Sequence, residues 1–313
     1  MQCFILAGGF ATRLWPLTER RAKPLLPVAG RPLLTHLVEK VPSHLPITVS
    51  TNAAFSKDMN EWAASLTRSV RIIVEDRGHE DVKLGALGAL SAWMRTEDIH
   101  DDILLLTGDN YLGFSIDQFL SSFKGNPLLA AHDIKDLEQA KKFGVVLLED
   151  GAVIAFEEKP LHPRSTLVST GCSILPSDCR DSICDYARKH ADNIGGMFEE
   201  FIRLKRNIDC FVFTEPWIDI GSFASYMDVH RLAVKGQLCM DGATVDRESI
   251  FEGSVALGEG TVIKKSTLID CIVFGHTTID DCVLRECIID EGCTLRGVDL
   301  SGKMLRSNTL LQR

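Results

Sequence analysis

Residues 2–18 of the chain read QCFILAGGFATRLWPLT, and residues 22–28 read AKPLLPV. The apolar run 3–7 has the composition of a buried β-strand, and Gly8 and Gly9 follow it directly. Two glycines after a strand let backbone N–H groups turn toward a phosphate, because no Cβ stands in the way. The stretch is not a P-loop, since no Gly-Lys-Ser/Thr follows. It predicts an anion-binding turn at a strand end.

Short apolar runs alternate with helical stretches from this strand to about residue 235. The helical stretches carry apolar residues at the 3.6-residue period. The pattern predicts strands at 3–7, 46–51, 70–75 and 102–107, with helices at 32–41, 55–66 and 84–94. Such alternation is typical of an α/β fold, here a Rossmann-like domain with a mixed, mostly parallel sheet. Ligands of these sheets bind beyond the carboxyl ends of the strands.

The rhythm changes after residue 126 to apolar runs separated by short polar turns, which indicates antiparallel strands and hairpins. We expect this part to form a wall that faces the substrate. The predicted strands are 128–132, 143–148, 152–156, 167–175, 208–213 and 217–220, and the predicted helices are 177–189, 196–205 and 222–235.

Apolar residues recur every six positions after residue 235, where the helical period disappears. The series consists of Leu257, Ile263, Ile269, then Val273, Ile279, then Val283, Ile289 and Leu295. This period is typical of a parallel β-helix with about 18 residues per coil. A β-sandwich could produce similar runs, but the spacing favours a short left-handed parallel β-helix. The predicted domains are therefore 1–236 and 237–313.

The chain has 34 basic and 43 acidic residues among 313, which gives a formal net charge of −9. This balance provides no sequence-independent attraction to nucleic acid or to an anionic membrane, so we expect neither as a partner. Any phosphate ligand must be held by local basic groups. The N-terminal residues contain neither a basic n-region nor a long apolar stretch, so we expect a cytoplasmic protein.

Ten cysteines lie at irregular intervals without a C-x2-C pair. Their spacing disfavours a metal site built from sulfur ligands. In a reducing compartment we expect them to be small buried side chains rather than disulfides.

Two further motifs place charged side chains after expected strands. Asp109 follows the strand 102–107, where a carboxylate is well placed to bind Mg²⁺ that bridges phosphates. The segment 156–160, FEEKP, offers carboxylates to hydroxyl groups and an ammonium to a phosphate. Taken alone, the first motif is more often a turn, and the second would be a solvated charged loop.

The stretch 6–34 resembles the signature of the sugar-1-phosphate nucleotidyltransferase (NDP-sugar pyrophosphorylase) family, LAGGxGTRLxPLT followed by PKPLxPV. The likeness covers residues 1–235, is greatest to archaeal-type members, and extends to the hexapeptide-repeat β-helix of many members. It implies that Arg13 and Lys23 are catalytic and neutralise charge at the α-phosphate and on departing pyrophosphate. The nucleotide-binding residues that it implies are Leu6, Ala7, Gly8, Gly9, Thr12 and Arg13. Ala11 stands where the family usually has its third glycine.

The resemblance also implies a magnesium site made by two carboxylates far apart in the sequence. Asp109 matches the metal ligand of the family's G-D motif and is also implied to be catalytic. Asp219, within WIDIG at 217–221, matches the Asp of W-x-D-T-G, with Ile220 in place of threonine. Mg²⁺ is therefore the expected cofactor.

Four residues match the family's sugar-phosphate site. Glu158 and Lys159 match E-E-K-P, in which the Glu meets sugar hydroxyls and the Lys meets the sugar phosphate. Gly144 and Thr170 match the Y-G-V-V and T-G segments that line the sugar pocket.

Residues 75–88 stand where relatives recognise the base, with Glu75 and Gly85 as the matching positions. Thymine and uracil present one donor between two acceptors, which suits an amide side chain. Guanine presents adjacent N–H donors, which a carboxylate accepts. Glu75 therefore shifts the expectation slightly toward guanine.

The resemblance implies an enzyme that joins a nucleoside triphosphate to a sugar 1-phosphate and releases pyrophosphate in one in-line displacement. The product would be of the GDP-mannose or dTDP/UDP-glucose type. We also expect a homo-oligomer through 237–313, because an uncovered coil end exposes strand edges.

Two alternatives stay open. Ala11 motivates the first, a catalytically idle regulatory subunit that binds nucleotide sugar. The second is a bifunctional enzyme whose β-helix transfers an acyl group, for which His276 is the only histidine in that region.

Overall fold

The structure is a computed structural model that describes residues 1–9, 12–75, 84–149 and 151–313. The chain divides into two compact units. The first unit contains Met1–Gly9 and Leu37–Trp217, and the second contains Phe10–His36 and Ile218–Arg313. The N-terminal segment after Gly9 thus belongs to the same compact unit as the C-terminal residues. The predicted boundary at residue 236 stays a prediction.

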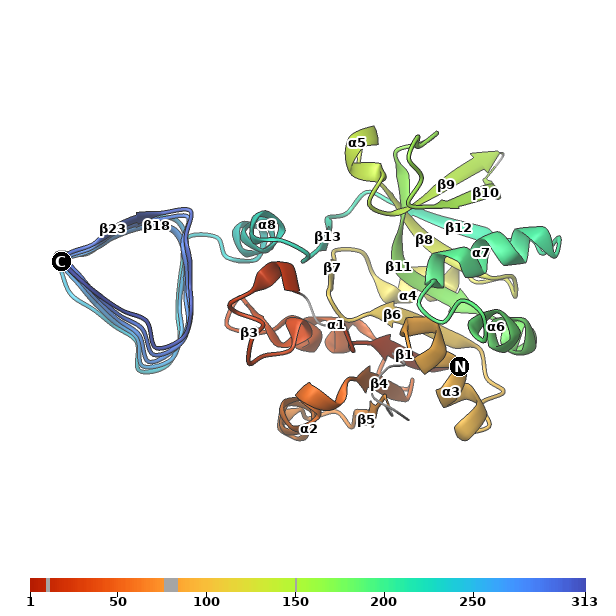
Figure 1. The fold of residues 1–313 in the computed structure, drawn as a ribbon, viewed down its shortest axis with the longest axis horizontal. Helices are drawn as coiled ribbons and strands as arrows, with labels where there is room; N and C mark the ends of the chain where they lie inside the picture. Colours follow the sequence, from red (N-terminus) through yellow and green to blue (C-terminus); the bar gives the residue numbers. More distant parts are fainter. Residues whose placement is uncertain (10–11, 76–83, 150) are drawn as a thin grey trace. The chain divides into compact units, whose positions relative to one another are not determined.

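A nine-stranded mixed sheet, counted over the described residues, forms the centre of the first unit (Figure 1). Its order is β5-β4-β1-β6-β11-β8-β12-β10-β9. The four strands β5, β4, β1 and β6 are mutually parallel, whereas β11 runs antiparallel to both β6 and β8. The strands are β1 (Gln2–Leu6), β4 (Ile47–Thr51), β5 (Arg71–Val74), β6 (Ile103–Thr107), β8 (Leu128–Asp133), β9 (Gly144–Glu149), β10 (Ala152–Glu158), β11 (Leu167–Leu175) and β12 (Asp209–Phe213). The expected α/β fold with a mixed sheet is confirmed.

Helices cover the sheet because their apolar sides need burial. The helices of the chain are α1 (Leu33–Lys40), α2 (Ser56–Ser65), α3 (Ala86–Thr96), α4 (Ile116–Ser121), α5 (Leu137–Ala140), α6 (Arg180–Ala187), α7 (Ile194–Arg203) and α8 (Phe223–Ala233). In the first unit α3, α6 and α7 share one core with β1, in which Phe4 stacks on Trp93 with ring centroids 4.6 Å apart. Burying one such aromatic side chain stabilises the fold by about 1.5–3 kcal/mol.

Most predicted elements lie within two residues of their observed positions. Five short elements of the described chain before α8 are absent from the prediction: the hairpin strands β2 (Pro27–Val28) and β3 (Arg31–Pro32), β7 (Asn110–Leu112), and the helices α4 and α5. Elements this short contain too few residues to show a period. The remaining strand before α8 is β13 (Trp217–Asp219).

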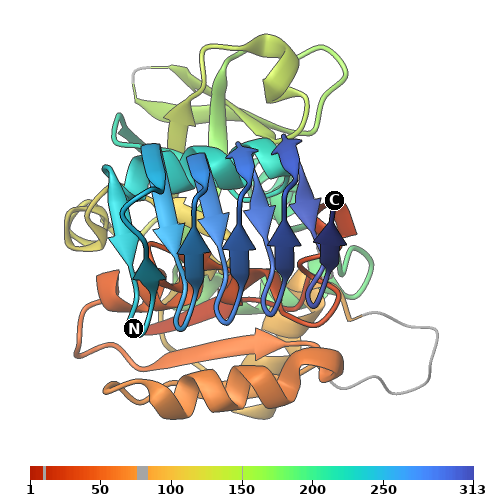
Figure 2. The ribbon, with the colours of Figure 1, turned by 90° about the vertical axis from the view of Figure 1, so that its left-hand side faces the viewer.

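A stack of parallel strands, residues 237–312, makes up most of the second unit; we call it the strand stack (Figures 1 and 2). Its strands are β14 (Gln237–Cys239), β15 (Thr244–Val245), β16 (Ile250–Leu257), β17 (Val262–Lys264), β18 (Thr267–Val273), β19 (Thr278–Asp280), β20 (Val283–Arg285), β21 (Ile288–Ile289), β22 (Thr294–Arg296), β23 (Asp299–Ser301), β24 (Met304–Leu305) and β25 (Leu310–Gln312). Apolar side chains from successive strands, among them Leu268, Leu284 and Leu295, form its buried core. That the coil is a left-handed β-helix stays a prediction.

The repeat of the strand stack shortens along the chain. Thr244 pairs with Val262, 18 positions later, as the sequence predicts. Val262 pairs with Thr278 and Thr278 with Thr294, so the later coils repeat every 16 residues, not 18.

Left-handed corner residues explain the shorter repeat. Residues with φ between +46° and +71° stand at positions 260, 265, 270 and 276, which are five, five and six residues apart. The same spacing continues through 281, 286, 292, 297, 302 and 308. Three tight corners therefore use 16 residues, which is why the predicted six-residue period slips.

Small side chains donate hydrogen bonds between coils near these corners. The Cys271 thiol donates to Leu284 O, the Cys287 thiol to Leu300 O, and the Thr277 hydroxyl to Asp290 O, each 13 residues ahead.

All ten cysteines are free, as expected, and eight are buried. Burial raises the pKa of Cys179 and Cys210 to about 12, so both remain neutral thiols. Cys239 is exposed, contrary to the prediction, because it lies in the first coil.

A glycine placed at a left-handed corner should stabilise the strand stack. Lys265 is exposed at φ +46°, a conformation that costs a residue with a Cβ about 1–2 kcal/mol. We expect Lys265→Gly to raise the free energy of unfolding by about 0.5–1 kcal/mol, after the gain of unfolded-chain entropy is subtracted. Denaturant unfolding of the full chain measures the change.

The matched control is Lys264→Gly, one residue earlier in β17 and equally exposed. Lys264 has ordinary strand geometry, so its replacement should lower the free energy of unfolding by about 0.5–1 kcal/mol. Equal losses in the two variants would contradict the corner argument.

Candidate functional site

Two parallel strands end side by side in the first unit. Leu6, the last residue of β1, lies opposite Thr107, the last residue of β6, and Gly108 N donates to Leu6 O at 2.8 Å. A Cβ on Gly108 would stand 3.3 Å from the Ala7 Cβ, so the two segments that follow β1 and β6 are in close contact. The fold therefore places the start of the glycine turn and Asp109 at the same edge of the sheet.

Glu75 lies against the glycine turn. A Cβ on Gly8 would come 2.3 Å from the Glu75 Oε1 atom, so only glycine leaves room for this carboxylate. Ser50 donates to the same oxygen at 3.3 Å, and the Asn52 amide donates to Gly8 O at 2.9 Å. The structure thus brings together two predicted nucleotide residues, and it adds Ser50 and Asn52, for which no motif gave a signal.

Asp109 is oriented by its neighbour Asn110. The Asn110 amide donates to Asp109 Oδ1 at 3.0 Å and also to the Thr107 hydroxyl. Trp217 Nε1 donates to Asn110 Oδ1 at 2.7 Å. Asn110 is 6% exposed, so its amide is held from both sides in a buried position. Asn110 belongs to the motif GDN at 108–110, and Trp217 is the first residue of WIDIG, but the sequence analysis gave neither residue a role.

Thr170 does not offer its side chain to a ligand. Thr170 is 1% exposed, and its hydroxyl donates to Ala130 O at 3.0 Å. The sheet therefore uses the donor of this hydroxyl, and the expectation that Thr170 lines the sugar pocket stays a prediction. The next residue, Gly171, has φ +72°, and a Cβ there would lie 2.4 Å from Thr107 Oγ1.

Glu158 lies between two glycines. A Cβ on Gly144 would stand 3.1 Å from Glu158 Oε2, and a Cβ on Gly195 would stand 1.8 Å from it. Lys159, at φ +47° and with a 65% exposed side chain, approaches Glu158 Oε1 at 3.2 Å. Three of the four predicted sugar-phosphate residues, Gly144, Glu158 and Lys159, therefore lie together.

The N-cap and first turn of α7 contain residues that the sequence analysis did not single out. Gly195 makes room for Glu158, and Asn193 caps α7 by accepting from Gly196 N at 2.8 Å. The pair Gly195-Gly196 in the first turn of an apolar helix is a signal that could have marked this position. Nearby, burial and then the Glu199, Glu200 and Glu158 carboxylates raise the pKa of Tyr186.

Gly85 has φ +66° at the start of α3. A Cβ there would lie 2.5 Å from Ala191 O, and Gly88 N donates to the same oxygen at 2.9 Å. Glycine is therefore required at residue 85 by both conformation and packing. The rest of the predicted base-binding stretch, residues 76–83, lies outside the described residues.

The second unit holds the predicted basic residues. Lys23, at 9% exposure, donates to Asp219 Oδ1 at 3.1 Å. A Cβ on Gly221 would be 3.6 Å from both Arg13 Nη2 and Asp219 Oδ2. Arg13, Lys23 and Asp219 are thus brought together although more than 200 positions of sequence lie between the first and the last.

Thr12, also predicted to bind nucleotide, begins the 3₁₀ turn Thr12–Leu14 and is exposed. Ala11 lies outside the described residues. His276 is at a corner of the strand stack with φ +55°. The described residues contain no group of three His, Cys, Asp or Glu side chains that would hold a metal by themselves.

Replacing Gly171 should disturb the Thr107–Asn110–Asp109 contacts. Gly171→Ala combines a left-handed backbone with a clash against Thr107, so we expect a loss of about 2–4 kcal/mol in the free energy of unfolding. Gly125→Ala is the matched control, because Gly125 has φ +96° with nothing within 4 Å of its Cβ position. It should lose about 1 kcal/mol, the conformational cost alone. Similar losses in both unfolding titrations would argue against the clash.

The chain is similar in sequence to known proteins over most of its length. A glucose-1-phosphate thymidylyltransferase of Streptomyces griseus is 25% identical and covers 96% of this chain and 89% of its own length. A mannose-1-phosphate guanylyltransferase of Mycobacterium tuberculosis is 25% identical and covers 90% of this chain and 82% of its own length.

The fold has a solved counterpart in Bacillus anthracis, a chain named as a proposed glucose-1-phosphate thymidylyltransferase. It is 24% identical, has a TM-score of 0.64, and covers 74% of this chain and 95% of its own length. Residues 2–236 match the profile of one family, described as nucleotidyl transferase. That match spans both the glycine turn after β1 and the Asp219 motif, and the chain therefore belongs to the nucleotidyl transferase family.

Proposed function

We propose that the protein transfers a nucleotidyl group from a nucleoside triphosphate to a sugar 1-phosphate and releases pyrophosphate. The observation that carries this proposal is the placement of the glycine turn and Asp109 at adjacent strand ends, in a chain of this family. Backbone N–H groups of the turn suit an anionic triphosphate, and a carboxylate beside it suits a bridging cation. The relatives named for thymidylyl and guanylyl transfer to sugar 1-phosphates support the same reaction.

The proposed triphosphate site uses the turn after β1. Leu6, Ala7, Gly8, Gly9 and Thr12 bind the phosphates, and Arg13 and Lys23 supply positive charge. The low exposure of Lys23 favours this role, because a charge that is shielded from water acts more strongly on a phosphate.

Members of this family generally use a divalent metal, and we propose Mg²⁺ with Asp109 and Asp219 as its protein ligands. Carboxylate oxygens are the donors that this hard cation prefers, so the residues fit the ion. Asn110 fixes one Asp109 oxygen and Lys23 approaches one Asp219 oxygen, which orients both carboxylates. Bound Mg²⁺ would neutralise charge that develops on the phosphates.

We propose that Glu158 and Lys159 bind the sugar 1-phosphate. Gly144 and Gly195 leave room for the Glu158 carboxylate, which can accept from hydroxyl groups of a sugar. The exposed Lys159 ammonium suits the phosphate. Any contribution of Thr170 would come from its backbone.

Glu75 and Gly85 are the proposed contacts to the base. Glu75 is held against Gly8 by Ser50, so its carboxylate is close to the proposed phosphate turn. A carboxylate accepts from the adjacent N–H donors of guanine, which favours GTP slightly over dTTP or UTP.

The chemistry requires no covalent enzyme intermediate. An oxygen of the sugar 1-phosphate attacks the α-phosphorus in line, a new P–O bond forms, and the bond to pyrophosphate breaks. The protein's contribution is to position the two substrates and to stabilise the charge that moves onto pyrophosphate.

Pyrophosphate release tests the proposal directly. The wild type should release pyrophosphate with Mg²⁺ for at least one pair of nucleotide (GTP, dTTP, UTP, CTP, ATP) and sugar 1-phosphate (mannose, glucose, galactose, N-acetylglucosamine). Asp109→Asn should lower turnover about 100-fold or more, because it removes a charge from the proposed metal site.

Asp117→Asn is the matched control, since Asp117 is an exposed acid in the first turn of α4. It should leave turnover unchanged. Chelation by EDTA should stop the reaction, and added Mg²⁺ should restore it. Silence across all pairs, with nucleotide sugar still bound, would favour the idle regulatory subunit.

We also propose a homo-oligomer through residues 237–313 in the cytoplasm. Leu310 in the last coil is 68% exposed, and β25 pairs on one side with β22, with no strand of the described chain on the other. Such an edge invites pairing with a second copy.

The free cysteines suit a reducing compartment. No helix in the described part of the chain is long and apolar enough to cross a membrane.

A charge at the exposed edge should reduce the mass of the protein in solution. We expect Leu310→Lys to dissociate the oligomer, because the ammonium cannot be buried against a second copy without cost. Leu161→Lys, at a leucine that is 81% exposed in the first unit, is the control and should keep the wild-type mass. Sedimentation gives the masses, and an unchanged mass for Leu310→Lys would refute this interface.

A further inference from the structure

The segment 12–36 contains two residues of the proposed reaction, Arg13 and Lys23, and it belongs to the compact unit of the strand stack. Apart from the first turn of α1, its secondary structure consists of short 3₁₀ turns and the hairpin of β2 and β3, whose strands have two residues each. A segment of this kind has few backbone bonds of its own to fix it. Its position must come from contacts with the rest of the second unit.

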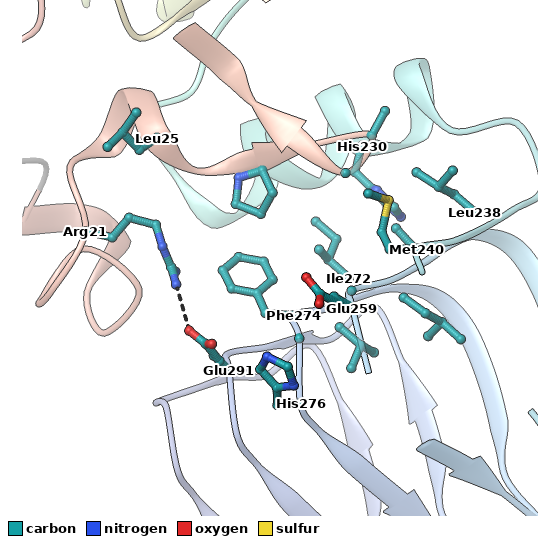
Figure 3. Close-up of a pocket in the computed structure, with 18 residues that line it drawn as sticks. Arg21, Leu25, His230, Leu238, Met240, Glu259, Ile272, Phe274, His276 and Glu291 are labelled. Carbon is teal, nitrogen blue, oxygen red and sulfur yellow. Dashed lines mark ion pairs between the residues drawn. The ribbon is translucent and has the colours of Figure 1, made fainter. Parts of the chain in front are cut away.

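Arg21 makes a set of such contacts with the strand stack (Figure 3). Arg21 Nη1 donates to Asp290 Oδ1 at 3.2 Å. Nη2 lies 3.7 Å from Glu291 Oε2, the ion pair that Figure 3 marks with a dashed line. The guanidinium carbon is 4.9 Å from the centre of the Phe274 ring. The Asp290 side chain is 7% exposed, so this ion pair is shielded from water. Removing either partner would leave the charge of the other one without compensation.

Two other contacts attach the same segment to the strand stack and to α8. Arg306 donates to Glu19 through Nε at 2.7 Å and Nη2 at 2.5 Å, a bidentate pair. The Tyr226 hydroxyl donates to Pro27 O at 2.6 Å. The segment is therefore attached on both sides of Lys23.

A cavity of about 320 Å³ borders Arg21, lined also by Leu25, Met240 and Phe274. Figure 3 shows the guanidinium reaching across toward the strand stack beside this space. The cavity leaves one side of the Arg21 side chain without packed neighbours. We therefore expect the ionic and cation–π contacts to set the position of Arg21. Lys23 is only two residues later and follows the fully buried Ala22, so a shift of Arg21 moves Lys23.

We propose that Arg21, held by Asp290, is a positioning residue that places Lys23 for the reaction. The strand stack then has a role in catalysis besides assembly, because it fixes the basic residues of the signature segment. This inference rests on the proposed nucleotidyl transfer. Arg21 itself is not assigned to substrate, and its effect passes through the chain to Lys23.

Four variants of the full-length protein test the proposal. Arg21→Ala and the isosteric Asp290→Asn should each lower kcat about 10- to 100-fold, since small misplacements of catalytic groups cost this much. The KM for the sugar 1-phosphate should change by less than about twofold, because the proposed sugar residues lie elsewhere. Arg21→Lys keeps a cation beside Asp290 and should recover most of the turnover.

Arg231→Ala is the matched control. Arg231 in α8 also pairs with the strand stack, at 3.3 Å from Asp270, and has similar exposure. Among the described residues, its ion pairs are with Asp228, Asp270 and Glu286, none of which lies in the segment 12–36. It should lower thermal stability about as much as Arg21→Ala does and leave kcat unchanged. Equal kcat losses in both arginine variants, or an unchanged kcat in Arg21→Ala, would overturn the proposal.

Hydrogen exchange gives a readout that does not need activity. Amides of residues 12–26 should exchange about tenfold faster in Arg21→Ala and Asp290→Asn and at the wild-type rate in Arg231→Ala, because only the first two release the segment. If the wild type released no pyrophosphate, the nucleotidyl transfer would fail while this arm still tested the attachment. Unchanged exchange in Arg21→Ala would overturn the attachment itself.

Discussion

The parallel pairing of β1 with β6 is the constraint on which the rest of the first unit depends. It aligns Leu6 with Thr107, and this register sets the level at which both chains leave the sheet. A slip of two residues would keep the same faces buried, yet it would separate the glycine turn from Asp109 by a distance that no side-chain rotation could correct. Gly108 and Gly171 are glycines because the chains pass so closely at this point.

Each compact unit contributes one kind of chemistry. The first unit brings the glycine turn, Asp109 and the carboxylate and ammonium of Glu158 and Lys159, all positioned by the nine-stranded sheet. The second unit contains the proposed residues Arg13, Lys23 and Asp219, and a short ion pair joins Lys23 to Asp219. Loss of the strand stack would therefore remove the support of basic residues that lie near the beginning of the sequence.

The sequence was informative wherever a long period or a long motif was present. Strands such as β1 and β6 follow from their apolar runs, and Gly8, Arg13 and Lys23 follow from the signature. Several neighbours of these residues could not be predicted, because Asn110 and Arg21 matter only through atoms that the fold brings near. Thr170 shows the converse: its motif matched, but the sheet had already used its hydroxyl. The coil length of 16 escaped prediction because it depends on backbone angles at corners, which non-glycine residues such as Lys265 and His276 also adopt.

The left-handed corners have a consequence for how this protein can vary in evolution. One residue inserted into a strand between two corners would turn the later apolar side chains of that coil away from the core. An insertion of 16 residues would instead add a complete coil and leave all other coils in register. Natural length variants should therefore differ by whole coils, or carry their extra residues as loops at a corner. The length of the strand stack is thus free to change in steps, while the coil that receives Arg21 must keep its place.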